Sequence, residues 1–287
     1  MRSESNGRMK LAAIVAMLML LVAAACGEEA PEPTDPGAGA TTGMDEPSFE
    51  TLEEGTLSVG SCLDYRPFEF VKGGEETGFD VEMAEEIASR LSLEVEWVRT
   101  NFDTIFTAVA GGQFDMVAAA STITDERLQT VDFSDPYFNA RQSLTVNTEE
   151  TPDLTSTDDL GDGDTVGVQK GTTGQAWAKE NLAPNGVQLK TFEGLPQAMT
   201  DLEGGAIVGV INDEGSSLAE AEQRSGLEVV EAIDTDEHYG FAFSKENPEL
   251  TEAVNGALAE IVLDGTWEEI FKKWFPDLPT PEEFQAS

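Results

Sequence analysis

Hydrophobic and polar positions follow two alternating patterns along most of the chain. Met83, Ile87 and Leu91 recur at four-residue spacing while charged residues take the opposite face, which predicts an amphipathic helix. The segment Leu93–Trp97 alternates residue by residue, as a half-buried strand does. The predicted order in this region is strand Thr56–Gly60, helix Val81–Leu91, strand Leu93–Trp97, helix Asp103–Ala110 and strand Phe114–Ala120. Strands that alternate with helices predict a mainly parallel sheet with helices on its faces.

The same alternation restarts after the polar segment Asn147–Asp162. The predicted strands there are Thr165–Val168, Val187–Phe192, Ile207–Ile211 and Leu227–Val230, and the predicted helices are Thr173–Leu182, Leu195–Leu202 and Glu214–Gln223. A final stretch adds a strand and two helices, Gly240–Phe243, Pro248–Leu263 and Thr266–Trp274. Because the second unit is complete without this stretch, we expect the chain to return to the first unit. The predicted fold class is therefore α/β with two lobes and two chain crossings, and such open sheets bind ligands beyond the carboxyl ends of their strands.

The N-terminal segment departs from both patterns. Arg2, Arg8 and Lys10 precede an apolar run, Leu11–Ala25, that is shorter than the roughly 20 residues of a transmembrane helix. A positive start, a short apolar core and small residues before a cleavage point predict a secretory signal peptide. The alternatives are an uncleaved anchor and an interior helix, and the residues that flank the run disfavour both.

A cysteine follows this run directly. The segment Leu21-Val22-Ala23-Ala24-Ala25-Cys26-Gly27 resembles the lipobox of bacterial lipoproteins, in which the cysteine becomes the lipidated N-terminus, although Ala23 stands where Leu is usual. Residues 27–54 are rich in Pro, Gly, Thr and acidic residues and contain no Lys or Arg, so we expect a disordered tether. The resemblance implies a protein outside the cytoplasm, anchored to the outer face of the cell membrane through Cys26.

These segments predict an order of parts along the chain. They are a signal peptide at 1–25, the lipidated cysteine and an acidic linker at 26–54, the first part of lobe 1 at 55–146, lobe 2 at 147–238, and a return to lobe 1 with C-terminal helices at 239–287.

Charge and composition exclude several classes of function. The formal net charge of −40 argues against nucleic-acid binding and against direct attraction to anionic lipid. His238 is the single histidine and lies beside a predicted hinge strand, where a structural role is expected. The sequence shows no metal-spaced His/Cys cluster and no phosphate loop. We therefore expect no catalytic residue, no metal and no cofactor.

Six short motifs follow one another over roughly residues 55–278. They are VGSCLDYRPFEF at 59–70, GFDV at 78–81, TITDER at 122–127, FSDPY at 133–137, DGTW at 264–267 and KKWF at 272–275. In this order they resemble the polar-amino-acid substrate-binding proteins of ABC importers, the family 3 extracellular solute-binding proteins. The resemblance implies a two-lobed periplasmic-binding-protein-like fold in which each lobe is a mainly parallel sheet flanked by helices. The ligand cleft would lie between the lobes, with hinge motion at the two crossings.

Arg127 ends the TITDER motif and matches the arginine that grips the ligand carboxylate in this family. Its planar fork can hold two oxygens at once, which a lysine cannot do. The alternative is a surface ion pair with Asp125 or Glu126.

Five other residues of the first lobe belong to the predicted site. Thr122 offers a hydroxyl and a backbone N–H, and the backbone of Ala119 and Ala120 lines the same strand end. Tyr65 and Phe102 match aromatic residues that enclose the ligand side chain, and the alternative is that either belongs to the core.

In the second lobe, the resemblance places the site at two strand ends. Gln169, Thr172 and Thr173 surround Gly171 at a strand-to-helix turn, where free N–H groups and the positive helix end favour an anion. Asp213 matches the aspartate that binds the ligand ammonium. Ordinary helix capping is the alternative for both the turn and Asp213.

The sequence says less about ligand choice. Relatives that bind cationic or amide side chains often carry Asp three residues before the aromatic Tyr65, where this chain has Cys62. A thiol is only a weak donor, which argues mildly against Lys or Arg as the preferred ligand. Asp64 either restores a cation site or faces solvent.

The resemblance implies a monomeric receptor, not an enzyme. It would bind a polar or small neutral free amino acid and deliver it to the permease subunits of an ABC importer. Two alternatives stay open: a lyase similar to cyclohexadienyl dehydratase on the same fold, and a ligand-binding module for a separate sensor kinase.

Overall fold

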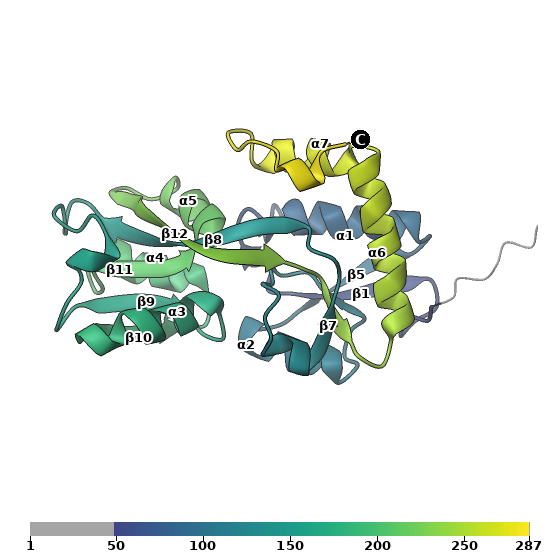
Figure 1. Ribbon diagram of the computed structural model, residues 1–287, viewed down its shortest axis with the longest axis horizontal. Coiled ribbons are helices and arrows are strands. Elements are labelled where there is room, and N and C mark those ends of the chain that lie inside the picture. Colours follow the sequence, from purple (N-terminus) through teal and green to yellow (C-terminus); the bar gives the residue numbers. More distant parts are fainter. Residues whose placement is uncertain (1–48, 287) are drawn as a thin grey trace, which may run out of the picture. The chain divides into compact units, whose positions relative to one another are not determined.

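A computed structural model describes residues 49–286 of the chain (Figure 1). The predicted signal peptide, Cys26 and the linker up to residue 48 lie outside the described residues. The described part contains two five-stranded sheets and one three-stranded sheet. No helix within residues 49–286 has the length and apolar character needed to cross a membrane.

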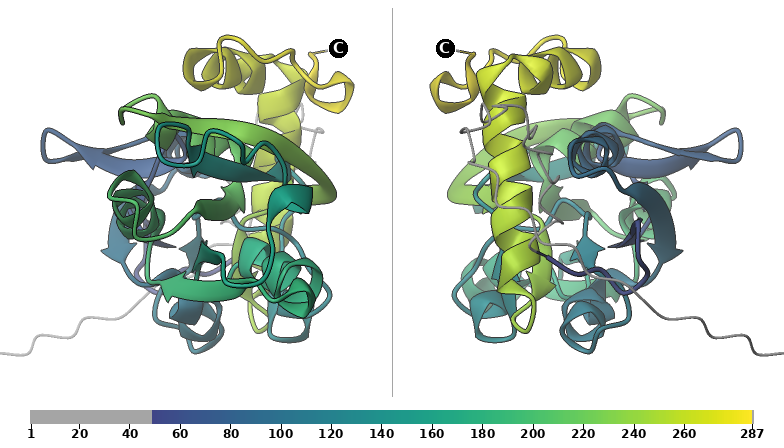
Figure 2. Two further views of the ribbon diagram at one scale, coloured as in Figure 1. Left: turned by 90° about the vertical axis from the view of Figure 1, so that its left-hand side faces the viewer. Right: turned by 90° about the vertical axis from the view of Figure 1, so that its right-hand side faces the viewer.

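The first lobe is built on a sheet with the strand order β5-β1-β6-β13-β7. Its strands are β1 (Thr56–Ser61), β5 (Glu94–Arg99), β6 (Met116–Val117), β7 (Val131–Phe133) and β13 (Ala242–Ser244). Its helices are α1 (Phe79–Arg90), α2 (Phe102–Ala110), α6 (Pro248–Leu263) and α7 (Thr266–Trp274). β1 runs parallel to β5 and β6, whereas β13 is antiparallel to β6 and β7. Figure 2 shows α6 along the lobe with α7 crosswise at its end, so the C-terminal stretch lies with the first lobe.

The second lobe has a sheet with the order β10-β9-β11-β8-β12. Its strands are β8 (Phe138–Asn147), β9 (Thr165–Gln169), β10 (Gln188–Phe192), β11 (Gly209–Asp213) and β12 (Leu227–Tyr239), and its helices are α3 (Thr173–Asn181), α4 (Leu195–Glu203) and α5 (Glu214–Ala221). β9, β10 and β11 are parallel, and β8 is antiparallel to both β11 and β12. In Figure 1 the paired strands β8 and β12 run from this lobe into the first one.

Strand β8 differs from the sequence-based assignment, which gave residues 55–146 to the first lobe. β8 pairs with β11 and β12, so residues 138–147 belong to the second sheet and the first crossing lies earlier than predicted. The strand escaped notice because Gln142 and Ser143, although polar, are fully buried. Their side chains are hydrogen-bonded, Ser143 to the carbonyl of Asn212 at 2.9 Å. Buried polar groups with partners do not produce an apolar strand pattern.

A small antiparallel sheet was also missed by the sequence pattern. It consists of β2 (Asp64–Tyr65), β3 (Glu69–Lys72) and β4 (Glu75–Thr77), and it sets Tyr65 opposite Glu69. These strands are shorter than a hydrophobic period can reveal. Gly78, which follows, has φ +138°, and a Cβ there would lie 2.0 Å from the carbonyl oxygen of Phe68. The GFDV motif therefore needs glycine where α1 begins against the 67–68 loop.

The aromatic residues of the motifs build the core of the first lobe. Tyr137 of FSDPY stacks on Phe241 with ring centroids 4.2 Å apart, and the indole N–H of Trp267 donates to the carbonyl of Tyr137 at 2.9 Å. Phe271 and Phe275 continue this cluster. The C-terminal motifs thus hold α7 against the first lobe, which explains why they accompany the site motifs.

Candidate ligand-binding cleft

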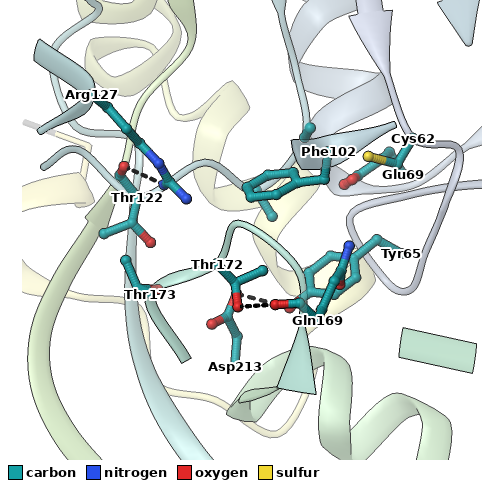
Figure 3. A pocket seen from close by; sticks show the side chains of 12 residues that line it. Cys62, Tyr65, Glu69, Phe102, Thr122, Arg127, Gln169, Thr172, Thr173 and Asp213 are labelled. Atoms are coloured by element: carbon teal, nitrogen blue, oxygen red, sulfur yellow. Dashed lines mark hydrogen bonds between the residues drawn. The ribbon is translucent and has the colours of Figure 1, made fainter. Parts of the chain in front are cut away.

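A cavity lies between the carboxyl ends of the strands of the two lobes (Figure 3). Its lining consists of Cys62, Tyr65, Glu69, Phe102, Ala119, Ala120, Thr122, Arg127, Gln169, Thr172, Thr173 and Asp213. The structure therefore brings together every site residue predicted from the sequence except Asp64. It adds one residue that the sequence did not indicate, Glu69.

Arg127 occupies one side of the cavity, at the start of a short 3₁₀ helix, Arg127–Gln129. Its Nη1 donates to the carbonyl of Thr122 at 2.7 Å and its Nη2 to the carbonyl of Gly171 at 3.1 Å. The guanidinium lies over the ring of Phe106, 4.6 Å from its centroid. Burial lowers the pKa of Arg127 to about 10, so the group stays cationic at neutral pH. Within residues 49–286 it forms no salt bridge, which removes the alternative of a surface ion pair.

Asp213 ends β11 on the other side of the cavity. Its Oδ2 accepts hydrogen bonds from the hydroxyls of Tyr65 at 2.8 Å and Tyr239 at 2.6 Å, and its Oδ1 accepts one from the Gln142 amide. Its side chain makes no capping bond to α5, so the alternative of helix capping does not apply. Burial and the nearby charge of Glu237 raise the pKa of Asp213 to about 6.

Glu237 is a second buried carboxylate behind the cavity wall, on the crossing strand β12. Its Oε2 accepts hydrogen bonds from the hydroxyls of Thr122 at 2.6 Å and Thr173 at 2.7 Å, which come from different lobes. The side-chain hydroxyls of these two predicted site residues are thus held by the protein itself. No sequence signal marked Glu237, because it lies in an acidic stretch that reads as solvated surface.

The turn at Gly171 both caps helix α3 and lines the cavity. The Thr172 hydroxyl accepts a hydrogen bond from the backbone N–H of Gln175 at 3.0 Å, so this side chain caps α3. The capping alternative therefore holds for the hydroxyl of Thr172, which also lines the cavity. Gly171 has φ +77°, and a Cβ there would lie 3.1 Å from the Cα of Asp103 in the first lobe. A glycine at this turn lets the two lobes approach each other.

The strand end in the first lobe is shaped by a buried carboxylate of the GFDV motif. Oδ2 of Asp80 accepts hydrogen bonds from the backbone N–H of Ala120 at 2.7 Å and from the hydroxyl of Tyr137 at 2.8 Å. Ala120 has φ +43°, a left-handed conformation that non-glycine residues rarely adopt. Because the Ala120 N–H donates to Asp80, it is already engaged within the protein. Asp80 thereby fixes the backbone that lines the cavity beside Thr122.

Three residues define the far end of the cavity. Tyr65 and Phe102 are both 8% exposed, and the Tyr65 hydroxyl reaches across to Asp213 in the second lobe. Cys62 is buried in the wall, and burial raises the pKa of its thiol well above the usual range. These positions agree with the predicted enclosure of a ligand side chain.

Asp64 is the exception among the predicted residues. It lies beside a neighbouring hollow, and its carboxylate is 3.9 Å from the guanidinium of Arg99. The one-residue offset from Tyr65 turns its side chain to the other face of the short strand β2. Asp64 is therefore not part of the cavity lining.

Glu69 reaches the cavity through its pairing opposite Tyr65 in the small sheet. It is 1% exposed, and neither carboxylate oxygen has a hydrogen-bond partner among residues 49–286. Burial and the negative charges of Asp80, Asp64 and Asp213 raise the pKa of Glu69 well above its ordinary value. The FEF sequence around it looks like an ordinary strand, so only the fold could identify this residue as part of the cavity.

Comparison with known proteins decides the family. Residues 57–277 match the bacterial extracellular solute-binding proteins, family 3. The chain belongs to this family. A probable histidine-binding protein of Campylobacter jejuni is 33% identical over 221 residues, which cover 76% of this chain and 84% of the relative. The L-cystine-binding protein TcyJ of Escherichia coli is 34% identical over 226 residues, which cover 78% of this chain and 84% of the relative.

Comparison with solved structures supports the same family and its fold. An ancestral arginine-binding protein bound to arginine has a TM-score of 0.74 and 39% identity, and the match covers 77% of this chain and 98% of that structure. Both the family and the two-lobed α/β fold predicted from the sequence are thereby confirmed.

Proposed function

We propose that this solute-binding protein is the extracytoplasmic receptor of an ABC importer, and that it binds a free polar amino acid in the cavity and delivers it to the permease. The observation that carries this proposal is the pair of opposite charges in one cavity. Arg127 comes from the first lobe and Asp213 from the second, and both line the same cavity. A free amino acid carries one carboxylate and one ammonium, which match these two groups.

Both charged groups keep capacity for a ligand. A guanidinium has five N–H donors, and two hydrogen bonds of Arg127 go to backbone carbonyls. A carboxylate offers about four acceptor sites, and three donors occupy Asp213. The α-carboxylate would bind Arg127 and the positive end of α3, and the α-ammonium would bind Asp213. Each ligand charge would then be satisfied in a closed space that excludes water.

The lobes meet around the cavity through direct contacts. The Lys170 ammonium of the second lobe lies 2.8 Å from the carboxylate of Asp103 in the first, and Tyr65 donates to Asp213. Arg127 donates to Gly171 across the same gap. A ligand that touches both lobes binds the closed arrangement more tightly than the open one, and it therefore shifts the hinge equilibrium toward closure.

The side chain of the ligand is proposed from the relatives and the cavity. Relatives are named for binding histidine, cystine and arginine, which favours a polar amino acid here as well. A small neutral amino acid is the remaining choice within the same function. Titration with the twenty amino acids tests the proposal, and incubation with arogenate tests the rival lyase. We expect a tight ligand without turnover, whereas phenylpyruvate formed from arogenate would establish the lyase.

Lipid anchorage at Cys26 is part of the proposal. The mature protein from its native host should partition into detergent and carry an acyl mass increment at a new N-terminal cysteine. At least two acyl chains are expected, because a single chain binds membranes only reversibly. Mass spectrometry checks this, with Cys26→Ser as the control that stops the modification. A native mature form that is unmodified and water-soluble would contradict the anchor.

A further inference from the structure

Glu69 differs from the other carboxylates around the cavity in having no partner. Asp213 and Glu237 each accept several hydrogen bonds, whereas both oxygens of Glu69 are unsatisfied among residues 49–286. Figure 3 shows the Glu69 carboxylate beside Cys62, with Phe102 between it and Arg127. Buried acidic side chains are rarely left in this condition unless a group outside the chain completes them.

The charges around the cavity indicate which kind of ligand group would pair with Glu69. The α-carboxylate and α-ammonium of an amino acid would pair with Arg127 and Asp213, which leaves the two carboxyl oxygens of Glu69 without a partner from the ligand backbone. The charges that act on Glu69 from its surroundings, those of Asp80, Asp64 and Asp213, are also negative. The nearby cation, Arg99, is exposed and faces Asp64 across the neighbouring hollow. The described residues therefore supply no countercharge to Glu69 inside the cavity.

We infer that Glu69 binds a positively charged group on the ligand side chain, so that the substrate class is the basic amino acids, with arginine as the best fit. This inference rests on the proposed function. Both oxygens of Glu69 lack partners, and a guanidinium can bind two carboxylate oxygens at once. Tyr65 and Phe102 enclose the same end of the cavity, where aromatic faces attract a planar cation.

This inference revises the sequence-based argument against cationic ligands. That argument considered Cys62, which stands three residues before Tyr65 where Asp is frequent in relatives. Glu69 reaches the same end of the cavity from the opposite strand, because β2 and β3 pair Tyr65 with Glu69. A carboxylate is therefore present near Cys62 although the expected Asp is not.

Arginine and citrulline provide the test, because citrulline has nearly the same shape and a neutral side-chain end. Calorimetric titration of the full mature protein should show arginine binding at least about 30-fold more tightly than citrulline. In Glu69→Gln this ratio should fall close to one, since the carboxamide leaves no charge to pair. Asp64→Asn is the matched control: it removes a nearby acid outside the cavity lining and should leave the ratio unchanged.

The outcomes separate this inference from the function on which it rests. If the wild-type protein binds glutamine, citrulline or another neutral amino acid as tightly as arginine, the inference is overturned and the proposed receptor function stands. A ratio that persists in Glu69→Gln overturns it as well. If no amino acid binds the wild-type protein, the proposed function itself fails. The wild-type comparison decides the inference even if the Glu69→Gln variant does not fold.

Discussion

Replacing Arg127 with alanine should abolish measurable binding of the amino acid while leaving the fold intact. Arg127 is the one cationic side chain in the cavity lining, and its hydrogen bonds go to the carbonyls of Thr122 and Gly171 on either side of the cleft. Losing a charged partner in a closed site costs about 2–5 kcal/mol, which corresponds to roughly 30-fold to several thousandfold in affinity. Calorimetry with the tightest ligand of the wild-type protein checks this.

Two further variants sharpen the Arg127 experiment. Arg127→Lys keeps the charge and loses the planar fork, so it should bind almost as poorly as the alanine variant. Arg99→Ala removes an exposed arginine that faces Asp64 at 3.9 Å, and its effect on affinity should be small. Near-native affinity in Arg127→Ala would remove the carboxylate site from this account.

Asp213→Asn should weaken binding by a similar factor, because the ligand ammonium loses its charged partner. The removal of a buried charged acceptor again costs about 2–5 kcal/mol. The substitution is nearly isosteric, so the contacts with Tyr65 and Tyr239 change chemistry more than shape. Calorimetry at neutral pH gives the loss of affinity, and thermal unfolding shows whether the variant is folded.

The pH dependence gives Asp213 a signature of its own. Its pKa is raised to about 6, and an ammonium bound beside it would lower that pKa. Binding must therefore release a proton below pH 6, and affinity should fall by up to about tenfold per pH unit there. The fall should be smaller in Asp213→Asn than in the wild-type protein. It should persist in Glu69→Gln, which removes any contribution from the other buried acid.

The opposite result has a clear meaning. Affinity that stays constant between pH 7 and pH 5 in the wild-type protein would show that no carboxylate with a pKa near 6 contacts the ligand. The assignment of the ammonium site to Asp213 would then be wrong.

The sequence predicted the helices well, because their signals are local. The bounds Pro248–Leu263 and Thr266–Trp274 agree with α6 and α7, where Pro and Gly mark the ends. The strand β8 was missed because Gln142 and Ser143 are buried although polar, and the Gln142 amide nitrogen and the Ser143 hydroxyl bond to partners distant in sequence. Such pairing depends on the fold and leaves no periodic pattern.

The same contrast applies to the site. Arg127 could be placed by the TITDER motif, and Asp213 by its place at the end of a predicted strand. Glu69 and Glu237 could not, since each is brought to the site by strand pairing that the sequence did not reveal, although Glu69 stands inside the first motif. The choice between the two alternatives for Asp64 stayed open for a related reason: a shift of one residue along β2 reverses the side-chain direction, and the sequence did not reveal this strand.

The central claim is that the cleft recognises both α-groups of a free amino acid, and one titration series tests it most directly. The wild-type protein is titrated with the twenty amino acids, and then with analogues of the tightest ligand that lack either the α-carboxylate or the α-ammonium. We predict tight binding of one amino acid or a chemically similar set, and a loss of at least about 30-fold for each analogue. If no amino acid binds, or if an analogue without one α-group binds as tightly as its parent, the account is contradicted.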